Sequence, residues 1–190
     1  MSALAPRRGG VIGGPEELDR ILWRLARELQ ERHPGGDRVT LCGIATRGVH
    51  LAARLAGLVE AQGGGHWLAV SLDTGPFRDD NPRVPGAGVP GTAPLPPAGR
   101  AAIDQRVVVL VDDVLFHGRT ARAALAALAG LGRPLAVELL VLVDRGHREL
   151  PLRATYVGRN LPTRVDERVR VRLRECDGED SITLAREEPE

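Results

Sequence analysis

The sequence predicts an α/β fold, with one domain spanning residues 1–190 and a mainly parallel, twisted sheet flanked by helices. Apolar stretches of strand length alternate along the chain with segments of helical periodicity, which is the pattern of a parallel sheet with helical crossovers. Successive positions in the strand-like stretches are apolar, as expected for strands covered on both faces. A chain of 190 residues that is 43% hydrophobic can bury one substantial core.

The first half of the chain should contain two helices and two strands. Leucine and isoleucine recur at spacings of three and four within residues 15–33, which predicts an amphipathic helix. The Pro-Gly-Gly sequence that follows should end this helix. We then expect a strand at 39–44, a turn at 45–48, a helix at 49–61 and a strand at 67–72.

Residues 74–105 differ in kind from the rest of the chain. Seven prolines interleaved with glycines leave no periodicity of either a strand or a helix. So long an irregular segment is either an active-site flap or a disordered insertion. The charged residues Arg78, Asp79 and Asp80 open the segment directly after a strand, which favours a flexible flap.

The second half returns to the alternating pattern. Residues 107–111 form a continuous apolar stretch, residues 119–131 an Ala/Leu-rich helix, and residues 136–143 another apolar strand. Short strands are expected around 155–157, 169–173 and 181–184. No internal repeat is visible.

Composition limits the classes of protein that fit. No apolar window approaches the length of a membrane span, and the N-terminus lacks the apolar core of a signal peptide, so we expect a cytoplasmic protein with no membrane partner. Two cysteines are too few for a disulfide framework or a thiolate metal cage.

Basic charge is concentrated in one segment. All 26 basic residues are arginines, which indicates a bias of the whole sequence, so that single arginines are weak evidence. Nine of them fall between Arg145 and Arg174, and an acidic segment follows from Glu175 to Glu190. The basic segment either attracts phosphate or RNA, or is a solvated strand face balanced by the acidic tail.

Polar residues gather where the predicted strands end. Ligands of open α/β sheets bind outside the carboxyl ends of the strands. The polar groups at four such ends are Thr46-Arg47-Gly48, Arg78-Asp79-Asp80, Asp112-Asp113 and the segment 144–148. We therefore expect one active site at this edge of the sheet.

The central motif is Asp112-Asp113 followed by a Gly-containing turn. Two adjacent carboxylates repel each other and need hydrogen-bond donors or a cation, which ribose hydroxyls and Mg²⁺ supply. The residues from His117 to Thr120 open a helix, whose first amides and Thr120 hydroxyl form a phosphate cradle. The combination predicts a site for a ribose 5-phosphate.

Other interpretations of the motif remain open. Asp-Asp at a strand end also occurs in receiver-domain phosphorylation sites, and Asp113 could merely cap the helix. The G-x-G-x-x-G fingerprint of dinucleotide binding is absent, and without lysine there is no Walker A loop.

The chain resembles a known family along most of its length. VVLVDDVLFHGRT is similar to the 5-phosphoribosyl-1-pyrophosphate (PRPP) signature of type I phosphoribosyltransferases. GIATRGVHLAARLA, FRDD, GRTARAAL and LVDRGHRELPLRATYVGRNLPT resemble the PyrR family of bifunctional pyrimidine-operon attenuators and uracil phosphoribosyltransferases, from about residue 18 to residue 184. This resemblance implies the type I phosphoribosyltransferase fold, with a small hood and a long flexible flap at about 74–105.

The resemblance also implies two activities and their partners. One activity transfers ribosyl phosphate from PRPP to N1 of uracil, giving UMP and pyrophosphate, with Mg²⁺ as cofactor. The other binds the leader mRNA of a pyrimidine operon in response to the uridine nucleotides UMP and UTP, which promotes transcription termination. The family forms dimers and larger homo-oligomers, so we expect the same here.

Site residues follow from the matched motifs. Asp112 and Asp113 should hold the ribose hydroxyls and Mg²⁺, and PRPP phosphate should bind His117, Gly118, Arg119 and Thr120. Pyrophosphate should bind Thr46, Arg47 and Gly48, the flap should carry Arg78, Asp79 and Asp80, and Arg145 should lie on the uracil side. The expected RNA-binding residues are Arg24, Arg27, His147, Arg148, Arg153 and Arg159.

Three departures from the family pattern bear on these expectations. His117 replaces the threonine of Thr-Gly-Arg-Thr, which removes one hydroxyl from the phosphate cradle, while a histidine could donate instead. Gly75 and Pro76 fall within the strand that leads into the flap and should end it early. On the RNA face, Trp23, Arg27 and Ala45 replace a small polar residue, a histidine and a lysine. A nucleotide-responsive RNA regulator without transferase activity, or a transferase without an RNA role, are the alternatives.

Overall fold

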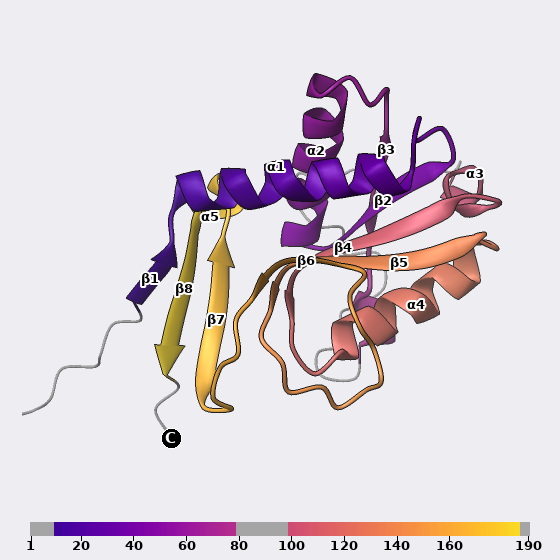
Figure 1. Cartoon of the computed structure of the whole chain (residues 1–190). Coiled ribbons are helices and arrows are strands. Elements are labelled where there is room, and N and C mark those ends of the chain that lie inside the picture. The colour runs from indigo at the N-terminus through magenta and orange to yellow at the C-terminus, as the bar shows by residue number, and fades with distance from the viewer. Residues whose placement is uncertain (1–9, 79–98, 187–190) are drawn as a thin grey trace, which may run out of the picture.

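The core of the molecule is a five-stranded parallel sheet. A computed structural model describes residues 10–78 and 99–186. The strand order is β3-β2-β4-β5-β6, with every neighbouring pair parallel (Figure 1). The strands are β2 (Val39–Ile44), β3 (Leu68–Leu72), β4 (Val107–Leu115), β5 (Ala136–Asp144) and β6 (Tyr156–Asn160). The expected α/β architecture is confirmed.

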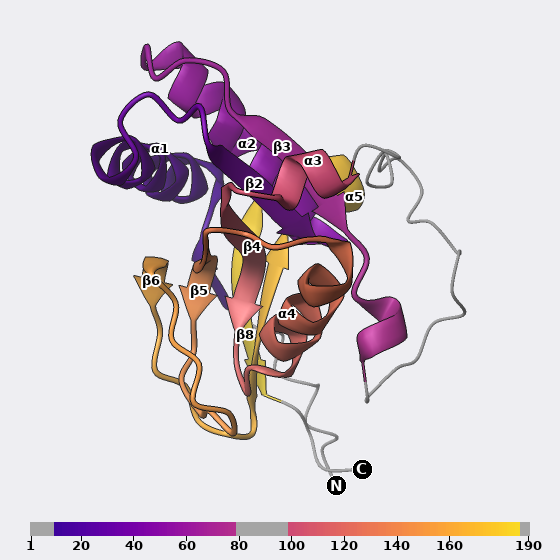
Figure 2. The same ribbon diagram turned by 90° about the vertical axis from the view of Figure 1, so that its right-hand side faces the viewer.

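Helices cover both faces of this sheet. Helices α1 (Pro15–Arg32) and α2 (Arg47–Ala61) lie on one face and α4 (Arg119–Leu131) lies on the other (Figure 2). Val109 and Val111 of β4 pack in the core beneath α1 and α2, whereas Val108 and Leu110 pack in the core beneath α4. Both faces of the strand are therefore buried, which explains its unbroken apolar sequence.

A second, smaller sheet lies beside the main one. Strands β1 (Gly10–Gly13), β8 (Ser181–Arg186) and β7 (Glu167–Arg172) pair antiparallel in the order β1-β8-β7, and α5 (Arg174–Asp177) connects the last two in the chain (Figure 1). Alternate residues of β7 are buried and exposed, as expected for a sheet with one solvated face. This unit occupies the place of the expected hood.

Several element boundaries differ from the predictions. Strand β4 runs four residues further than predicted and includes Asp112 and Asp113, while α2 begins two residues earlier, at Arg47. The segment 74–105 is not irregular throughout, because a 3-10 turn (Gly75–Phe77) and α3 (Gly99–Ile103) form at its two ends. Residues 79–98, including Asp79 and Asp80 of the expected flap, lie outside the described residues.

The helices also bear on whether the chain crosses a membrane. Within residues 10–78 and 99–186, none of them combines the length and the apolarity that crossing a bilayer requires.

Candidate active site

The carboxyl ends of the parallel strands bring the predicted polar residues to one edge of the sheet. In the strand register, Gly43 of β2 pairs with Val111 of β4, and Leu115 of β4 pairs with Asp144 of β5. The turn before α2, the acidic pair and the segment after β5 therefore follow three adjacent strands. Three of the four expected strand ends thus lie next to one another, and the fourth includes Asp79 and Asp80, which lie outside the described residues.

The acidic pair lies near the end of β4, partly buried. The Asp113 amide donates to Asp112 Oδ1 at 2.9 Å, and the Val114 amide donates to Asp113 Oδ1 at 2.9 Å. Burial and the neighbouring Asp113 carboxylate raise the pKa of Asp112 well above its usual value. Burial also raises the pKa of Asp113, although Asp112 and Arg47 oppose this. A cation or further hydrogen-bond donors would therefore stabilise the ionised form of the pair.

A cavity of about 200 Å³ opens at the acidic pair. Its lining includes Asp112, Arg78 and the loop from β4 into α4, and comprises Arg78, Asp112, Val114, Leu115, Phe116, His117, Gly118, Arg119, Thr120 and Ala121. Gly118 has φ +93° and directly precedes α4, so this left-handed turn is available to glycine at little cost. The first amides of α4 consequently open at the cavity, where an anion binds favourably.

Glu149 lies between the Arg119 and His117 side chains of this loop. Arg119 donates to Glu149 Oε2 from Nε at 2.9 Å and from Nη2 at 2.6 Å. His117 Nδ1 lies 3.6 Å from Glu149 Oε1, and its ring stacks on Phe116 with the centroids 3.5 Å apart. A phosphate entering the cavity would compete with Glu149 for these donors.

The first turn of α2 packs tightly against β4. A Cβ atom on Gly48 would lie 2.2 Å from the carbonyl oxygen of Val111, so only glycine fits there. Arg47 donates to Asp177 of α5 from Nη2 at 2.8 Å and from Nε at 3.2 Å. Arg47 is thus placed beside the acidic pair, but its charge is shared with a carboxylate of the small-sheet unit.

Arg145, expected on the uracil side, is buried with 5% of its surface exposed. Its guanidinium lies 3.8 Å from the centroid of Phe116. Its Nε donates to Thr163 Oγ1 and its Nη2 to the Arg164 carbonyl, both at 3.0 Å. Arg145 therefore braces the aromatic side of the phosphate loop.

The residues expected to bind RNA fall into two groups. Arg24 donates to the carbonyls of Val157 at 3.1 Å and Gly158 at 2.5 Å, and Arg159 donates to the Ile12 carbonyl at 2.8 Å. Arg148 likewise points inward, toward the loop between β4 and α4. Arg24 remains exposed beside the carbonyls that it contacts, and Arg27, His147 and Arg153 are exposed as well.

Trp23 adds an aromatic side chain to the exposed group. It is 49% exposed, and the Arg27 guanidinium lies 5.5 Å from its ring centroid. Arg27 also lies 3.9 Å from Glu31. An exposed tryptophan beside an arginine offers a stacking surface for an unpaired base.

Two functional contacts were not foreseen from the sequence. Neither Glu149 nor Asp177 was expected at the site, although each holds one of its arginines. Both lie in basic or mixed-charge stretches, where a single carboxylate carries no distinctive signal. Only the fold brings them to the edge of the main sheet.

Comparisons with known proteins agree with this geometry. The model of the family described as "Phosphoribosyl transferase domain" matches residues 16–169. "Bifunctional protein PyrR" of Streptomyces coelicolor is 53% identical over 174 residues, which cover 92% of this chain and 88% of that protein. "Bifunctional protein PyrR" of Corynebacterium efficiens is 47% identical over 193 residues, covering 98% of each chain.

Solved structures share the fold at low sequence identity. The hypoxanthine phosphoribosyltransferase of Trypanosoma cruzi superposes with a TM-score of 0.66 at 16% identity, covering 94% of this chain and 97% of that one. The HGPRT-ase of Leishmania tarentolae gives 0.67 at 13% identity, covering 97% and 100%. Together with the parallel sheet, these matches show the type I phosphoribosyltransferase fold.

Proposed function

Since the chain belongs to the PyrR family of phosphoribosyl transferase domain proteins, we propose that it transfers ribosyl phosphate from PRPP to uracil, forming UMP and pyrophosphate. The observation that carries this proposal is one cavity that is lined both by Asp112, near the end of β4, and by the loop that leads into the first turn of α4. Carboxylates accept hydrogen bonds from the ribose hydroxyls, and the amides at the start of a helix bind the 5-phosphate. A cytoplasmic homo-oligomer is part of the proposal.

Mg²⁺ fits the residues at this site as an ion shared with PRPP. Asp112 and Asp113 offer hard oxygen ligands, and burial raises the pKa of both carboxyls, so a bound cation would stabilise their ionised forms. Across residues 10–78 and 99–186, no group of three or more His, Cys, Asp or Glu side chains could hold a metal ion. Such an ion would therefore complete its shell with substrate oxygens and water. When bound, Mg²⁺ neutralises charge on the departing pyrophosphate.

The protein's own residues bind and orient the reactants. Asp112 and Asp113 fix the ribose through its hydroxyls, and the loop from His117 to Thr120 fixes the phosphate. Arg47 and Arg78, which lie nearest the acidic pair, face the leaving group. No side-chain nucleophile is required. The reaction is accelerated because the protein holds uracil in position against an oxocarbenium-like sugar.

Transferase activity is tested by incorporation of radiolabelled uracil into UMP. We expect UMP to form only with both PRPP and Mg²⁺. Asp113→Asn should reduce kcat/KM for PRPP by about 100-fold or more, with an unchanged circular dichroism spectrum. Absence of UMP at saturating substrate would refute the transferase, and unchanged kinetics in the variant would refute the assignment of the diol site.

We propose further that the protein binds a pyrimidine-operon leader mRNA in response to UMP and UTP. The exposed side chains Trp23, Arg27, His147 and Arg153 support this, because basic groups contact phosphates and an aromatic ring stacks on unpaired bases. In this proposal Arg24, Arg148 and Arg159 act through the backbone that they hold.

Gel-shift titration of a leader hairpin, with and without UMP, tests the RNA role. Wild-type protein should bind more tightly with UMP, and Trp23→Ala and Arg153→Gln should each weaken binding about tenfold. Arg133→Gln removes an exposed arginine at the opposite end of α4 and should bind as wild type. Indifference to both UMP and hairpin sequence would contradict attenuation.

A further inference from the structure

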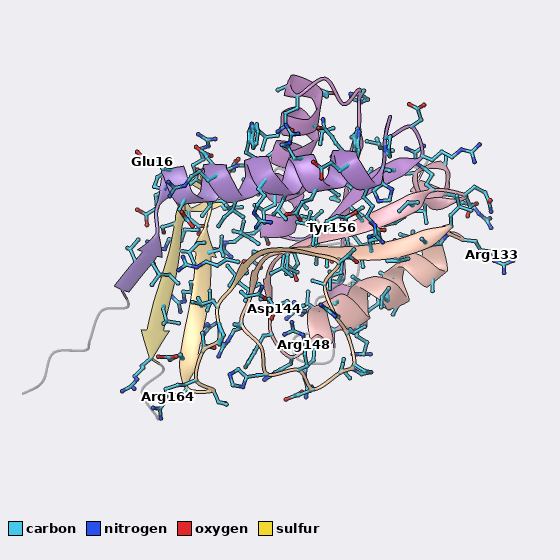
Figure 3. The ribbon with its side chains drawn as sticks, viewed as in Figure 1. Glu16, Arg133, Asp144, Arg148, Tyr156 and Arg164 are labelled. Atoms are coloured by element: carbon cyan, nitrogen blue, oxygen red, sulfur yellow. The ribbon has the colours of Figure 1, made fainter. Side chains whose placement is uncertain are left out.

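One arginine fastens the phosphate loop to the segment after β5. The Arg148 guanidinium donates to the carbonyls of Phe116 at 2.7 Å, Gly146 at 2.9 Å, Leu152 at 3.3 Å and Leu115 at 3.4 Å. It also forms an ion pair with Asp144. Figure 3 shows Arg148 and Asp144 side by side near the start of α4. The side chain is 22% exposed.

Backbone hydrogen bonds join the same two segments. The amides of Glu149 and Leu150 donate to the His117 carbonyl at 3.1 and 3.2 Å, and the Arg145 amide donates to the Leu115 carbonyl at 3.1 Å. Consecutive carbonyls of the phosphate loop, at residues 115, 116 and 117, are thus all held by residues 145–150. Among the hydrogen bonds of the described residues, the Phe116 carbonyl accepts only from the side chain of Arg148.

A hydrogen bond that fixes the Phe116 carbonyl also fixes the direction of the next backbone amide. A peptide unit is planar, so fixing the Phe116 carbonyl fixes the direction of the His117 N–H in the same plane. The next residue, Gly118, has φ +93° and would not by itself restrict the turn. The orientation of the amides that enter the phosphate cradle consequently depends on the Arg148 contact.

We propose that Arg148 is a positioning residue for the phosphate cradle, which it shapes through the Leu115 and Phe116 carbonyls. This inference rests on the proposed transferase function, and it gives Arg148 a role distinct from contact with RNA. An arginine directed to RNA would leave these carbonyls and the Asp144 carboxylate without their donor. Preorganised amides bind the phosphate without first having to be ordered.

Steady-state kinetics of Arg148→Ala provide the first test. KM for PRPP should rise about tenfold or more, while KM for uracil stays within about twofold, because the Phe116 carbonyl loses its donor whereas the segment after β5 keeps its own backbone hydrogen bonds. Added guanidinium ion at millimolar concentration should restore part of the PRPP affinity. Arg133→Ala, a matched control at the far end of α4 (Figure 3), should show neither effect. A KM for PRPP within twofold of wild type would overturn the proposal.

Hydrogen exchange separates this proposal from the proposed function, because it needs no catalysis. In ligand-free Arg148→Ala, amides of residues 116–120 should exchange at least tenfold faster than in wild type, with the strands unchanged. If wild type makes no UMP but this difference appears, the transferase proposal fails while the loop role stands. Unchanged exchange would overturn the loop role. Should Arg148→Ala fail to fold, Asp144→Asn, which removes only the paired carboxylate, should give a smaller change in the same amides.

Discussion

Burial first, and the neighbouring Asp113 carboxylate second, make the ionised form of Asp112 unfavourable in the folded protein. The pKa of Asp112 is raised by burial and by its neighbour, so its ionised form is less stable in the fold than in the unfolded chain. Such an acid stabilises the fold at pH values below its unfolded pKa, and this contribution is lost as the pH rises through the folded pKa. At neutral pH the carboxylate therefore destabilises the ligand-free protein.

Asp112→Asn should accordingly raise the stability of the ligand-free protein. The same change should weaken the binding of PRPP and Mg²⁺. We expect the free energy of unfolding at pH 7 to rise by about 1 kcal/mol, and Tm by about 2–4 °C, because a neutral amide replaces a repelled carboxylate. The gain should vanish when unfolding is measured at about pH 4, where Asp112 is protonated. Thermal unfolding with and without PRPP and Mg²⁺ measures both effects. A lower Tm for the variant at pH 7 would contradict this account.

His117 lines the cavity at the proposed phosphate cradle. Its ring lies on Phe116 and its Nδ1 faces Glu149, so it offers no hydroxyl to the ligand. His117→Thr supplies one and should lower KM for PRPP about three- to tenfold, the effect of one hydrogen bond to a charged group. His66→Thr, at an 83% exposed side chain beyond the opposite edge of the sheet, is the control. An unchanged KM would assign His117 no part in phosphate binding.

At the scale of elements, periodicity and apolar runs were sufficient to predict the main sheet. Strand β2 and helix α4 have the predicted bounds; Gly132 and Pro134 end the helical pattern of α4 sharply. Strand β1 was missed, since Gly10 and Gly13 leave it almost no apolar signal. The four-residue helix α5 is too short for any helical period to appear. The last four residues of β4 were missed because two adjacent aspartates are more typical of a loop than of a strand.

The roles of the arginines could not be predicted to the same degree. Arg24, Arg148 and Arg159 donate to backbone carbonyl oxygens, although Arg24 stays exposed, whereas Arg27 and Arg153 are exposed without such a contact among the described hydrogen bonds. A guanidinium satisfies backbone carbonyls and RNA phosphates equally well, so the residue type does not distinguish the two. The difference arises from which loop carbonyls the fold places nearby.

Helix α2 offers a matched pair of glycines that tests how the element positions the site. At Gly48 an added methyl group would meet the Val111 carbonyl, whereas at exposed Gly57 it would meet nothing within 4 Å. Gly48→Ala should lower the free energy of unfolding by about 1–3 kcal/mol and raise KM for PRPP, because the Arg47 turn must move. Gly57→Ala should instead raise the free energy of unfolding by about 0.5–1 kcal/mol with unchanged kinetics. Denaturant unfolding and steady-state assays measure both; equal effects at the two sites would contradict the packing argument.

At the scale of the whole molecule, the two sheets are joined by ion pairs from α2. Arg54 donates to Glu175 at 2.6 and 2.8 Å and to Asp180 at 2.7 and 3.1 Å, and both partners lie between β7 and β8. The Arg54 side chain is 10% exposed and that of Asp180 is 5% exposed. Arg47 makes a parallel connection to Asp177 nearer the site. The position of the small sheet relative to the main sheet therefore depends on charged side chains that are largely buried between the two.

Removing Arg54 should be far more damaging than removing an exposed arginine of the same unit. Arg54→Met leaves the buried Asp180 carboxylate without its main partner, which should cost about 3 kcal/mol and lower Tm by roughly 10 °C. Arg172→Met breaks an ion pair with Glu179 whose side chains are about half exposed, 48% and 55%, and should change stability by less than about 0.5 kcal/mol.

The loss from Arg54→Met should depend on pH with a defined sign. A hydrogen bond from Arg54 lowers the pKa of Glu175, and at Asp180 the bonds from Arg54 and the Arg174 amide outweigh burial, so that pKa is lowered too. A lowered pKa gives stability that is present above about pH 4, the unfolded value, and is lost as the pH falls through the folded pKa. The difference between wild type and Arg54→Met should therefore be full at pH 7 and shrink below about pH 4. Unfolding curves at both pH values test this, and a difference that grows on acidification would show that the ion pairs do not hold the two sheets together.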